Sequence, residues 1–193
     1  MQLRNLPNAL TIFRLVLVPI LLMTPLLPDN WSSWAALAVL VCAGMTDYLD
    51  GALARRLNVM SEIGRMLDPI ADKLMIASAI LLLLWQGSAP LVPAIVIIAR
   101  ELLVSGLREY LALVGQKLEV SLLAKWKTTL QFVALAVLMT AGAPNVPDLR
   151  GFSLEIMGVG LFWAAGLLTL ITGYQYWAEA YSFAVDQHSE TAS

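Results

Sequence analysis

Four aspartates stand out in a chain that is otherwise rich in apolar residues. They are Asp47, Asp50, Asp68 and Asp72. All four fall near the ends of two apolar runs, where a carboxylate is costly to bury unless a cation or a hydrogen-bond donor compensates for its charge. Acidic residues within membrane segments usually serve a function, so these four indicate a binding or catalytic site.

Helix periodicity places the four aspartates on two faces. Asp47 and Asp50 are three residues apart and share one helix face. Asp68 and Asp72 are four residues apart and share one face of the next helix. An antiparallel pair of helices with a short connection brings both faces to the same depth. The spacing therefore predicts that the four carboxylates converge.

Small residues share the two acidic faces. They are Gly51, Ala54 and Gly64. Because they have almost no side chain, a ligand can approach the helix backbone beside the aspartates. The alternative is that they let the two helices pack closely, as small residues four apart do in membranes. The sequence leaves both explanations open.

The ligand types in the cluster indicate which cation would compensate for its charge. Carboxylate oxygens without Cys or His suit Mg²⁺, Mn²⁺ or Ca²⁺ rather than zinc. Two such ions would neutralise four carboxylates and could hold a pyrophosphate group. Protonation of the carboxylates is the alternative, because like charges in a low dielectric raise one another's proton affinity.

The composition predicts the kind of protein that carries this cluster. The 193 residues are 59% hydrophobic and 13% charged, and the mean hydropathy is +0.75. Soluble domains have about 25% charged residues. We therefore expect an all-α integral membrane protein whose surroundings are the lipid bilayer. The net charge of −2 gives no indication of nucleic-acid binding.

Six apolar segments are long enough to form transmembrane helices. They cover residues 9–28, 31–54, 64–86, 89–114, 122–141 and 152–178. Each approaches or exceeds the ~20 residues that cross a ~30 Å hydrocarbon core as a helix. Turn-forming stretches such as "LPDNWSS" and "QGSAP" separate them. The prediction is one six-helix catalytic domain over residues 1–182 and a polar C-terminal tail over 183–193.

The distribution of basic residues predicts the orientation. If the N-terminus is cytoplasmic, every Lys and Arg except Arg150 lies on the inner side, as the positive-inside rule requires. Trp31, Trp34 and Trp85 then fall at the outer membrane boundary, where aromatic residues are enriched. Both termini and the aspartates are therefore expected at the cytoplasmic side.

The segment from Met45 to Met75 resembles the signature of the CDP-alcohol phosphatidyltransferase family. The signature positions are Asp47, Asp50, Gly51, Ala54, Arg55, Gly64, Asp68 and Asp72. The length and the six-helix layout also match, so the resemblance implies the CDP-alcohol phosphotransferase fold. It further implies that an acceptor hydroxyl displaces CMP from a CDP-linked lipid or alcohol.

The same resemblance implies a role for each signature residue. The four aspartates would bind two Mg²⁺ or Mn²⁺ ions, and Asp72 would also be the base that takes the proton of the attacking hydroxyl. The residues around the CDP nucleotide would be Asp47, Gly51, Ala54, Arg55, Gly64, Asn8 and Thr11. Arg14 would stand beside the last two, although a polar helix start with an anchoring arginine explains these three residues equally well.

A group of basic residues later in the chain is a candidate binding site for the acceptor. It consists of Arg100, Arg108, Lys125 and Lys127. Arg100 and Arg108 are eight residues apart, about two helical turns, and share one face. The group predicts a pocket for the phosphate of a phosphorylated acceptor. Positive-inside anchoring to lipid phosphates is the alternative.

Several short segments resemble one bacterial branch of the family. They are "NLPNALTIFRLVLVP", "LDPIADKLM", "AREL", "GLRE" and "KWKTT". This branch joins CDP-diacylglycerol to sn-glycerol 3-phosphate and releases CMP, so the resemblance also implies a bacterial inner membrane and a homodimer. The branches that make cardiolipin, phosphatidylserine or phosphatidylinositol-type lipids are alternatives.

A cation or proton transporter is the alternative from a different functional class, because transporters also use intramembrane carboxylates. Transport sites usually lie near the bilayer midplane, whereas these aspartates cluster toward one end of their helices. An enzyme is therefore favoured.

Overall fold

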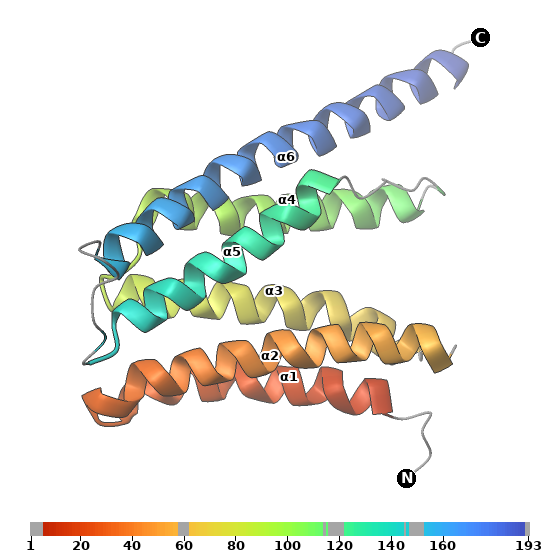
Figure 1. Ribbon diagram of the computed structural model, residues 1–193. Coiled ribbons are helices and arrows are strands. Elements are labelled where there is room, and N and C mark those ends of the chain that lie inside the picture. Colours follow the sequence, from red (N-terminus) through yellow and green to blue (C-terminus); the bar gives the residue numbers. More distant parts are fainter. Residues whose placement is uncertain are drawn as a thin grey trace. The chain divides into compact units, whose positions relative to one another are not determined.

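The computed structural model describes residues 6–57, 62–113, 115, 122–144, 146 and 153–191. Every regular element within these residues is helical, which confirms the all-α prediction (Figure 1). The elements are α1 (Leu6–Met23), η2 (Thr24–Leu26), α2 (Asp29–Leu57), α3 (Glu62–Trp85), α4 (Leu91–Leu113), α5 (Leu122–Ala141) and α6 (Leu154–Thr191).

Each of the six predicted segments corresponds to one α-helix. The predicted and observed helix boundaries differ by a few residues at most ends. The predicted turn "QGSAP" ends α3. Gly87 has a φ of +73°, a left-handed conformation that favours glycine. The N–H of Ser88 donates to the carbonyl of Leu83 at 2.9 Å, so the turn satisfies a carbonyl that the helix end would leave free.

The last helix is longer than predicted. The sixth apolar segment ends near residue 178, but α6 continues to Thr191 and includes most of the predicted polar tail. The stretch after Gly173 contains no Gly or Pro that would end a helix. Apolar composition marks where a helix leaves lipid, and it does not mark where the helix ends.

Three helical stretches of the described chain are long and apolar enough to cross a membrane. They are Ala9–Leu26, Asp29–Leu49 and Leu154–Phe183. Large apolar side chains are exposed along all six α-helices, among them Leu22, Leu81 and Leu170. This pattern fits lipid surroundings, because lipid tails do not drive apolar side chains inward. The chain is therefore a membrane protein.

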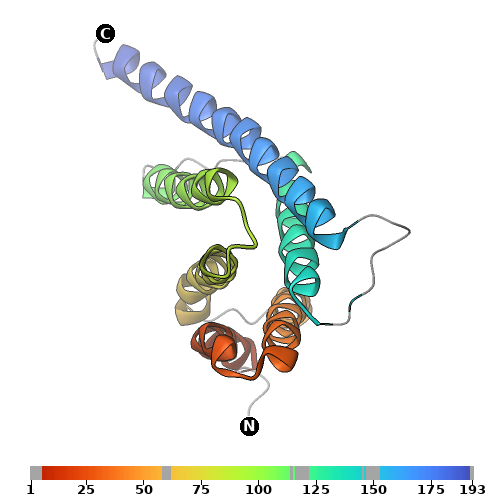
Figure 2. The ribbon, with the colours of Figure 1, turned by 90° about the vertical axis from the view of Figure 1, so that its left-hand side faces the viewer.

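The chain forms two compact units. The first unit comprises residues 1–89 and 135–158, and the second comprises residues 90–134 and 159–193. In the first unit, α1 lies against both α2 and α3 (Figures 1 and 2). Fully buried side chains such as Leu21, Leu40 and Leu83 form the core of this unit.

Small residues allow close helix contacts in the second unit. A Cβ on Gly166 of α6 would lie 2.9 Å from the Cβ of Pro93 on α4. A Cβ on Gly173 would lie 3.0 Å from the Cγ of Arg100. The two glycines are seven residues apart, about two turns, so they present one face of α6 to α4. The arginine can reach α6 because position 173 has no side chain.

Candidate active site

Three of the four predicted aspartates converge on one atom, the Nη1 of Arg14. This nitrogen lies 3.1 Å from the Oδ1 of Asp47 and 3.5 Å from the Oδ1 of Asp68. It also forms an ion pair and a hydrogen bond with the Oδ1 of Asp72. The carboxylates come from α2 and α3 and the arginine comes from α1. The structure therefore brings Asp47, Asp68 and Asp72 together, as the helix faces predicted.

The first helix supplies a second polar contact to the cluster. The Oγ1 of Thr11 donates to the Oδ1 of Asp68 at 3.0 Å. Thr11 and Arg14 are three residues apart on α1, so they project from one face, and both are buried at 1% exposure. The burial and ion pairs of Arg14 show that it is not a lipid-facing anchor. Thr11 and Arg14 therefore belong to the aspartate cluster.

Several predicted site residues lie outside the described side chains. They are Asn8, Asp50, Gly51, Ala54, Arg55 and Gly64. The backbone of each belongs to α1, α2 or α3, as predicted. Their contributions to the site remain predictions.

The cluster is open on the side of the carboxylates and closed on the side of the arginine. The side chains of Asp47, Asp68 and Asp72 are 52%, 32% and 48% exposed, whereas that of Arg14 is 1% exposed. The guanidinium therefore lies beneath carboxylates that a ligand can reach. This arrangement neutralises part of the negative charge from the protein side.

The donor set fits a hard divalent cation, because it consists of carboxylate oxygens that already share one positive centre. Among the residues whose side chains are described, no three Asp, Glu, His or Cys residues form a ready-made metal site. The point on which the three carboxylates converge is taken by the Nη1 of Arg14. Asp50, the fourth predicted ligand, lies outside those side chains.

The basic group of the second unit is built around Tyr176 of α6. The Nη2 of Arg108 donates to the Oη of Tyr176 at 2.8 Å. The guanidinium carbons of Arg108 and Arg100 lie 4.9 Å and 5.3 Å from the centre of the tyrosine ring. Both distances are within the range of cation–π attraction. One buried aromatic ring therefore holds two arginines of α4.

Glu101 connects the same group to α5. Its Oε1 accepts a hydrogen bond from the Nη1 of Arg100 at 3.3 Å and forms an ion pair with the Nζ of Lys127. Lys127 is 3% exposed, so its charge needs this partner. The Nη2 of Arg100 also donates to the Oγ1 of Thr172 at 3.3 Å. Two cations thus share one carboxylate, and Arg108 adds a third positive charge to the group through Tyr176. The excess positive charge suits an anion.

Three of the four predicted basic residues meet in this group, and one does not. Arg100, Arg108 and Lys127 share partners, whereas the side chain of Lys125 is exposed. Among the described residues, the side chain of Lys125 has no ion pair or hydrogen bond, and its carbonyl accepts from the Oγ1 of Thr129. Two residues apart on a helix means opposite faces, which explains why Lys127 turns inward and Lys125 does not.

Sequence reasoning did not assign Glu101, Thr172 or Tyr176 to the basic group. The position of Glu101 directly after Arg100 was a usable signal, because a buried cation needs a counter-charge. No comparable signal marks Tyr176, since aromatic residues are common along α6. The second unit also holds three buried side-chain polar atoms without a hydrogen-bond partner among the described residues, the Nε of Arg100, the Nε2 of Gln131 and the Oγ1 of Thr169.

Comparison with known proteins identifies the family. The family model described as CDP-alcohol phosphatidyltransferase matches residues 4–174, which include the four predicted aspartates and the four predicted basic residues. The chain belongs to the CDP-alcohol phosphatidyltransferase family. The resemblance found in the signature from Asp47 to Asp72 is therefore confirmed.

Named relatives of this CDP-alcohol phosphatidyltransferase cover nearly its whole length. A protein of Rickettsia bellii (strain RML369-C) is 42% identical over 173 residues, 89% of this chain and 93% of its own. Proteins of Shigella flexneri serotype 5b (strain 8401) and Escherichia coli (strain K12) are each 39% identical over 187 residues, 95% of this chain and 98% of their own. All three are named CDP-diacylglycerol–glycerol-3-phosphate 3-phosphatidyltransferase.

Proposed function

We propose that this enzyme is a phosphatidylglycerophosphate synthase, which transfers the phosphatidyl group of CDP-diacylglycerol to sn-glycerol 3-phosphate and releases CMP. The observation that carries the proposal is the identity of 39–42% to relatives of that name over most of the chain. The convergence of Asp47, Asp68 and Asp72 supports the transfer chemistry. The excess positive charge of the basic group supports a phosphorylated acceptor.

The reaction is a single displacement at phosphorus. The carboxylate of Asp72 takes the proton of the C1 hydroxyl of glycerol 3-phosphate. The hydroxyl oxygen forms a bond to the phosphorus that carries diacylglycerol, and the bond from that phosphorus to the oxygen of CMP breaks. CMP leaves with the electron pair, and phosphatidylglycerophosphate remains. Positioning and charge neutralisation supply most of the rate enhancement in phosphoryl transfer.

Members of this family generally use divalent metal ions. We assign two Mg²⁺ or Mn²⁺ ions to the four aspartates of the signature, Asp47, Asp50, Asp68 and Asp72. When bound, they would neutralise the carboxylates and the pyrophosphate of the substrate. Arg14 supplies a further, permanent positive charge to the same carboxylates. It therefore holds Asp72 in place from beneath while the exposed side faces the substrate.

The cytidine nucleotide is assigned to the helix ends around the same cluster. The proposed contacts are Asp47, Gly51, Ala54, Arg55, Gly64, Asn8 and Thr11. Of the last two, Thr11 is supported by its hydrogen bond to Asp68. The phosphate of the acceptor is assigned to Arg100, Arg108 and Lys127, with Lys125 at an exposed position.

We further propose that the protein spans a bacterial inner membrane with six helices. Both termini and the active site then lie at the cytoplasmic side. The three apolar spans and the positions of the basic residues support it. A homodimer is proposed from the family resemblance alone.

The test is CMP release by the purified enzyme from CDP-diacylglycerol in detergent micelles with Mn²⁺ or Mg²⁺. Glycerol 3-phosphate, phosphatidylglycerol, serine and inositol phosphate are compared as acceptors at equal concentration. We expect CMP release with glycerol 3-phosphate and little CMP release with the other three acceptors. Preference for another acceptor would move the enzyme to that branch, and absence of CMP release with every acceptor would contradict a transferase.

A further inference from the structure

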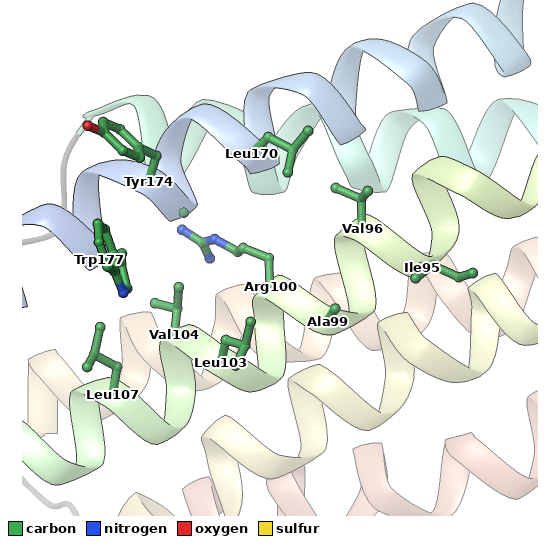
Figure 3. Close-up of a pocket in the computed structure, with 11 residues that line it drawn as sticks. Ile95, Val96, Ala99, Arg100, Leu103, Val104, Leu107, Leu170, Tyr174 and Trp177 are labelled. Atoms are coloured by element: carbon green, nitrogen blue, oxygen red, sulfur yellow. The ribbon is translucent and has the colours of Figure 1, made fainter.

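An apolar groove of about 560 Å³ lies between α4 and α6 in the second unit (Figure 3). Residues between Ile95 and Leu107 line it from α4, and residues between Leu170 and Trp177 line it from α6. Its volume falls within the range of about 300–1,000 Å³ that is typical of ligand pockets. The groove is therefore large enough for a ligand.

The length of the groove matches one leaflet of a bilayer. The stretch of α4 from Ile95 to Leu107 rises about 18 Å at ~1.5 Å per residue. Half of a ~30 Å hydrocarbon core is about 15 Å. The groove is therefore long enough to hold the headgroup of a phospholipid and the adjoining part of one acyl chain.

Among the described residues that line the groove, Arg100 is the only charged one. Figure 3 shows its side chain reaching from α4 toward α6. An arginine carries five N–H donors, and Arg100 uses one on Glu101 and one on Thr172. Its Nε is buried without a hydrogen-bond partner among the described residues. Each of the two Nη atoms uses one of two N–H groups on these partners, so each has one donor left at the edge of an apolar channel, and the side chain is 11% exposed.

Aromatic side chains stand at one end of the groove. Figure 3 shows Trp177 near Val104 and Leu107, whereas Leu170 lies at the other end near Val96. The rings of Trp177 and Tyr181 stack with their centres 5.5 Å apart, and both side chains are exposed. Exposed tryptophan and tyrosine are enriched at the level of lipid headgroups. This end of the groove is thus suited to a headgroup and the other end to a hydrocarbon chain.

We propose that this groove binds one anionic phospholipid, with an acyl chain along Ile95 to Ala99 and the phosphate at Arg100. The positive charge of Arg100 argues against a second copy of this chain as the occupant of the groove. The cations of the basic group outnumber Glu101, the one carboxylate among the described residues that pairs with them. An apolar helix face from another copy would cover Arg100 without supplying a further anion, and buried excess charge is costly. A phospholipid supplies the anion and the apolar chain in one molecule.

The inference does not rest on the transfer reaction, but it has a consequence for the proposed acceptor site. Arg100 belongs to both the groove and the basic group. A bound anionic lipid and glycerol 3-phosphate would therefore compete for the same guanidinium. Such competition would let the anionic lipid content of the membrane lower the affinity for the acceptor.

The test measures lipid binding to the delipidated full-length protein by native mass spectrometry, without CDP-diacylglycerol or acceptor. Dioleoyl phosphatidylglycerol is compared with dioleoyl phosphatidylcholine. The proposal expects one tightly bound phosphatidylglycerol per chain and weaker binding of phosphatidylcholine. Arg100→Gln is expected to remove the preference between the two lipids, because it removes the charge and leaves the apolar channel.

Two tryptophan substitutions on neighbouring residues separate the groove from the general lipid surface. Leu103 lines the groove and is 72% exposed, whereas Leu102 is 63% exposed and does not line it. Leu103→Trp is expected to weaken phosphatidylglycerol binding about tenfold or more, because overfilling an apolar site is costly. Leu102→Trp is expected to bind as the unmodified chain does. Ile95→Trp repeats the test at a second exposed groove position if Leu103→Trp does not fold.

Equal binding by the groove variants and Leu102→Trp would overturn the proposal. Disulfide cross-linking between two Leu103→Cys chains, in protein that binds no lipid, would assign the groove to a second copy and also overturn it. CMP release is measured separately on the same preparations. An inactive protein that binds lipid would contradict only the proposed function, and an active protein that binds none would contradict only this inference.

Discussion

Arg14 of α1 forms an ion pair with Asp72 of α3, the residue proposed to be the catalytic base. The Nη1 of Arg14, which makes this ion pair, also lies 3.1 Å from the Oδ1 of Asp47 on α2. Arg14, which lies outside the signature segment, therefore links α2 to α3. The position of the base depends on α1 as well as on the helix that carries it.

Replacement of Asp72 by Asn should nearly abolish transfer. The amide keeps the shape of the side chain but cannot take the proton of the acceptor hydroxyl, and general base catalysis contributes about 10²–10⁴-fold. Initial rates of CMP release at saturating substrates measure the loss. Asp29→Asn, at an exposed position in the first turn of α2, is the matched control. Near-normal turnover by Asp72→Asn with Mn²⁺ bound would show that another group is the base.

Replacement of Arg14 by Gln should make the stability of the protein more dependent on metal. Without the guanidinium, the carboxylates lose their internal counter-charge, which should lower the metal-free stability by about 1–3 kcal/mol. Mn²⁺ or Mg²⁺ binds the folded state and should restore much of this loss. Thermal unfolding in EDTA and in Mn²⁺ measures the difference. Arg108→Gln, in the second unit, should keep the metal dependence of the unmodified chain, and an equal result for Arg14→Gln would exclude this role.

Replacement of Arg108 by Gln should raise the KM for glycerol 3-phosphate. Loss of one hydrogen bond to a charged group costs about 1.5–3 kcal/mol, which corresponds to about 10- to 100-fold in affinity. The KM for CDP-diacylglycerol should change little. Lys125→Gln is the comparison, because it removes an exposed charge of the same predicted group. If Lys125→Gln has the larger effect, the acceptor phosphate does not bind at the group around Tyr176.

Two substitutions of Tyr176 should separate its ring from its hydroxyl. Tyr176→Phe keeps the ring beneath both arginines and loses one hydrogen bond, so we expect the KM for the acceptor to rise about two- to tenfold. Tyr176→Leu also loses the cation–π contacts and should raise the KM further. In both variants the kcat at saturating acceptor should stay close to that of the unmodified enzyme. A fall in kcat without a change in KM would show that Tyr176 does not act through acceptor binding.

The sequence was sufficient to predict that the three described aspartates of the first unit converge. Helix periodicity placed Asp47 on one face of α2 and both Asp68 and Asp72 on one face of α3, and a short connection leaves little choice in how such faces meet. The position of α1 was not predictable in the same way. Periodicity shows which face of a helix is polar, but it does not show which neighbour that face contacts, so Arg14 remained ambiguous.

The second unit shows a different limit. Charge alone marked Arg100, Arg108 and Lys127, because basic residues are rare in an apolar chain. Their partners were harder to find, since Tyr176 is separated from Arg108 by 68 residues of sequence. The long-range contact depends on the packing of α4 against α6, which no local pattern encodes. The sequence does indicate that Lys125 and Lys127 point to different sides of α5, because they are two residues apart on one helix.

The ion cluster around Arg14 also bears on how the chain is made. Synthesis proceeds from the N-terminus, so α1 reaches the membrane before Asp47 and Asp72 do. Arginine and aspartate each cost about 2.5–3.5 kcal/mol at the centre of an isolated membrane helix and less toward its ends. Pairing removes part of both costs only once α3 has arrived. The first three helices should therefore insert most stably as a set, and a nascent chain that ends before α3 should be a poor substrate for the insertion machinery.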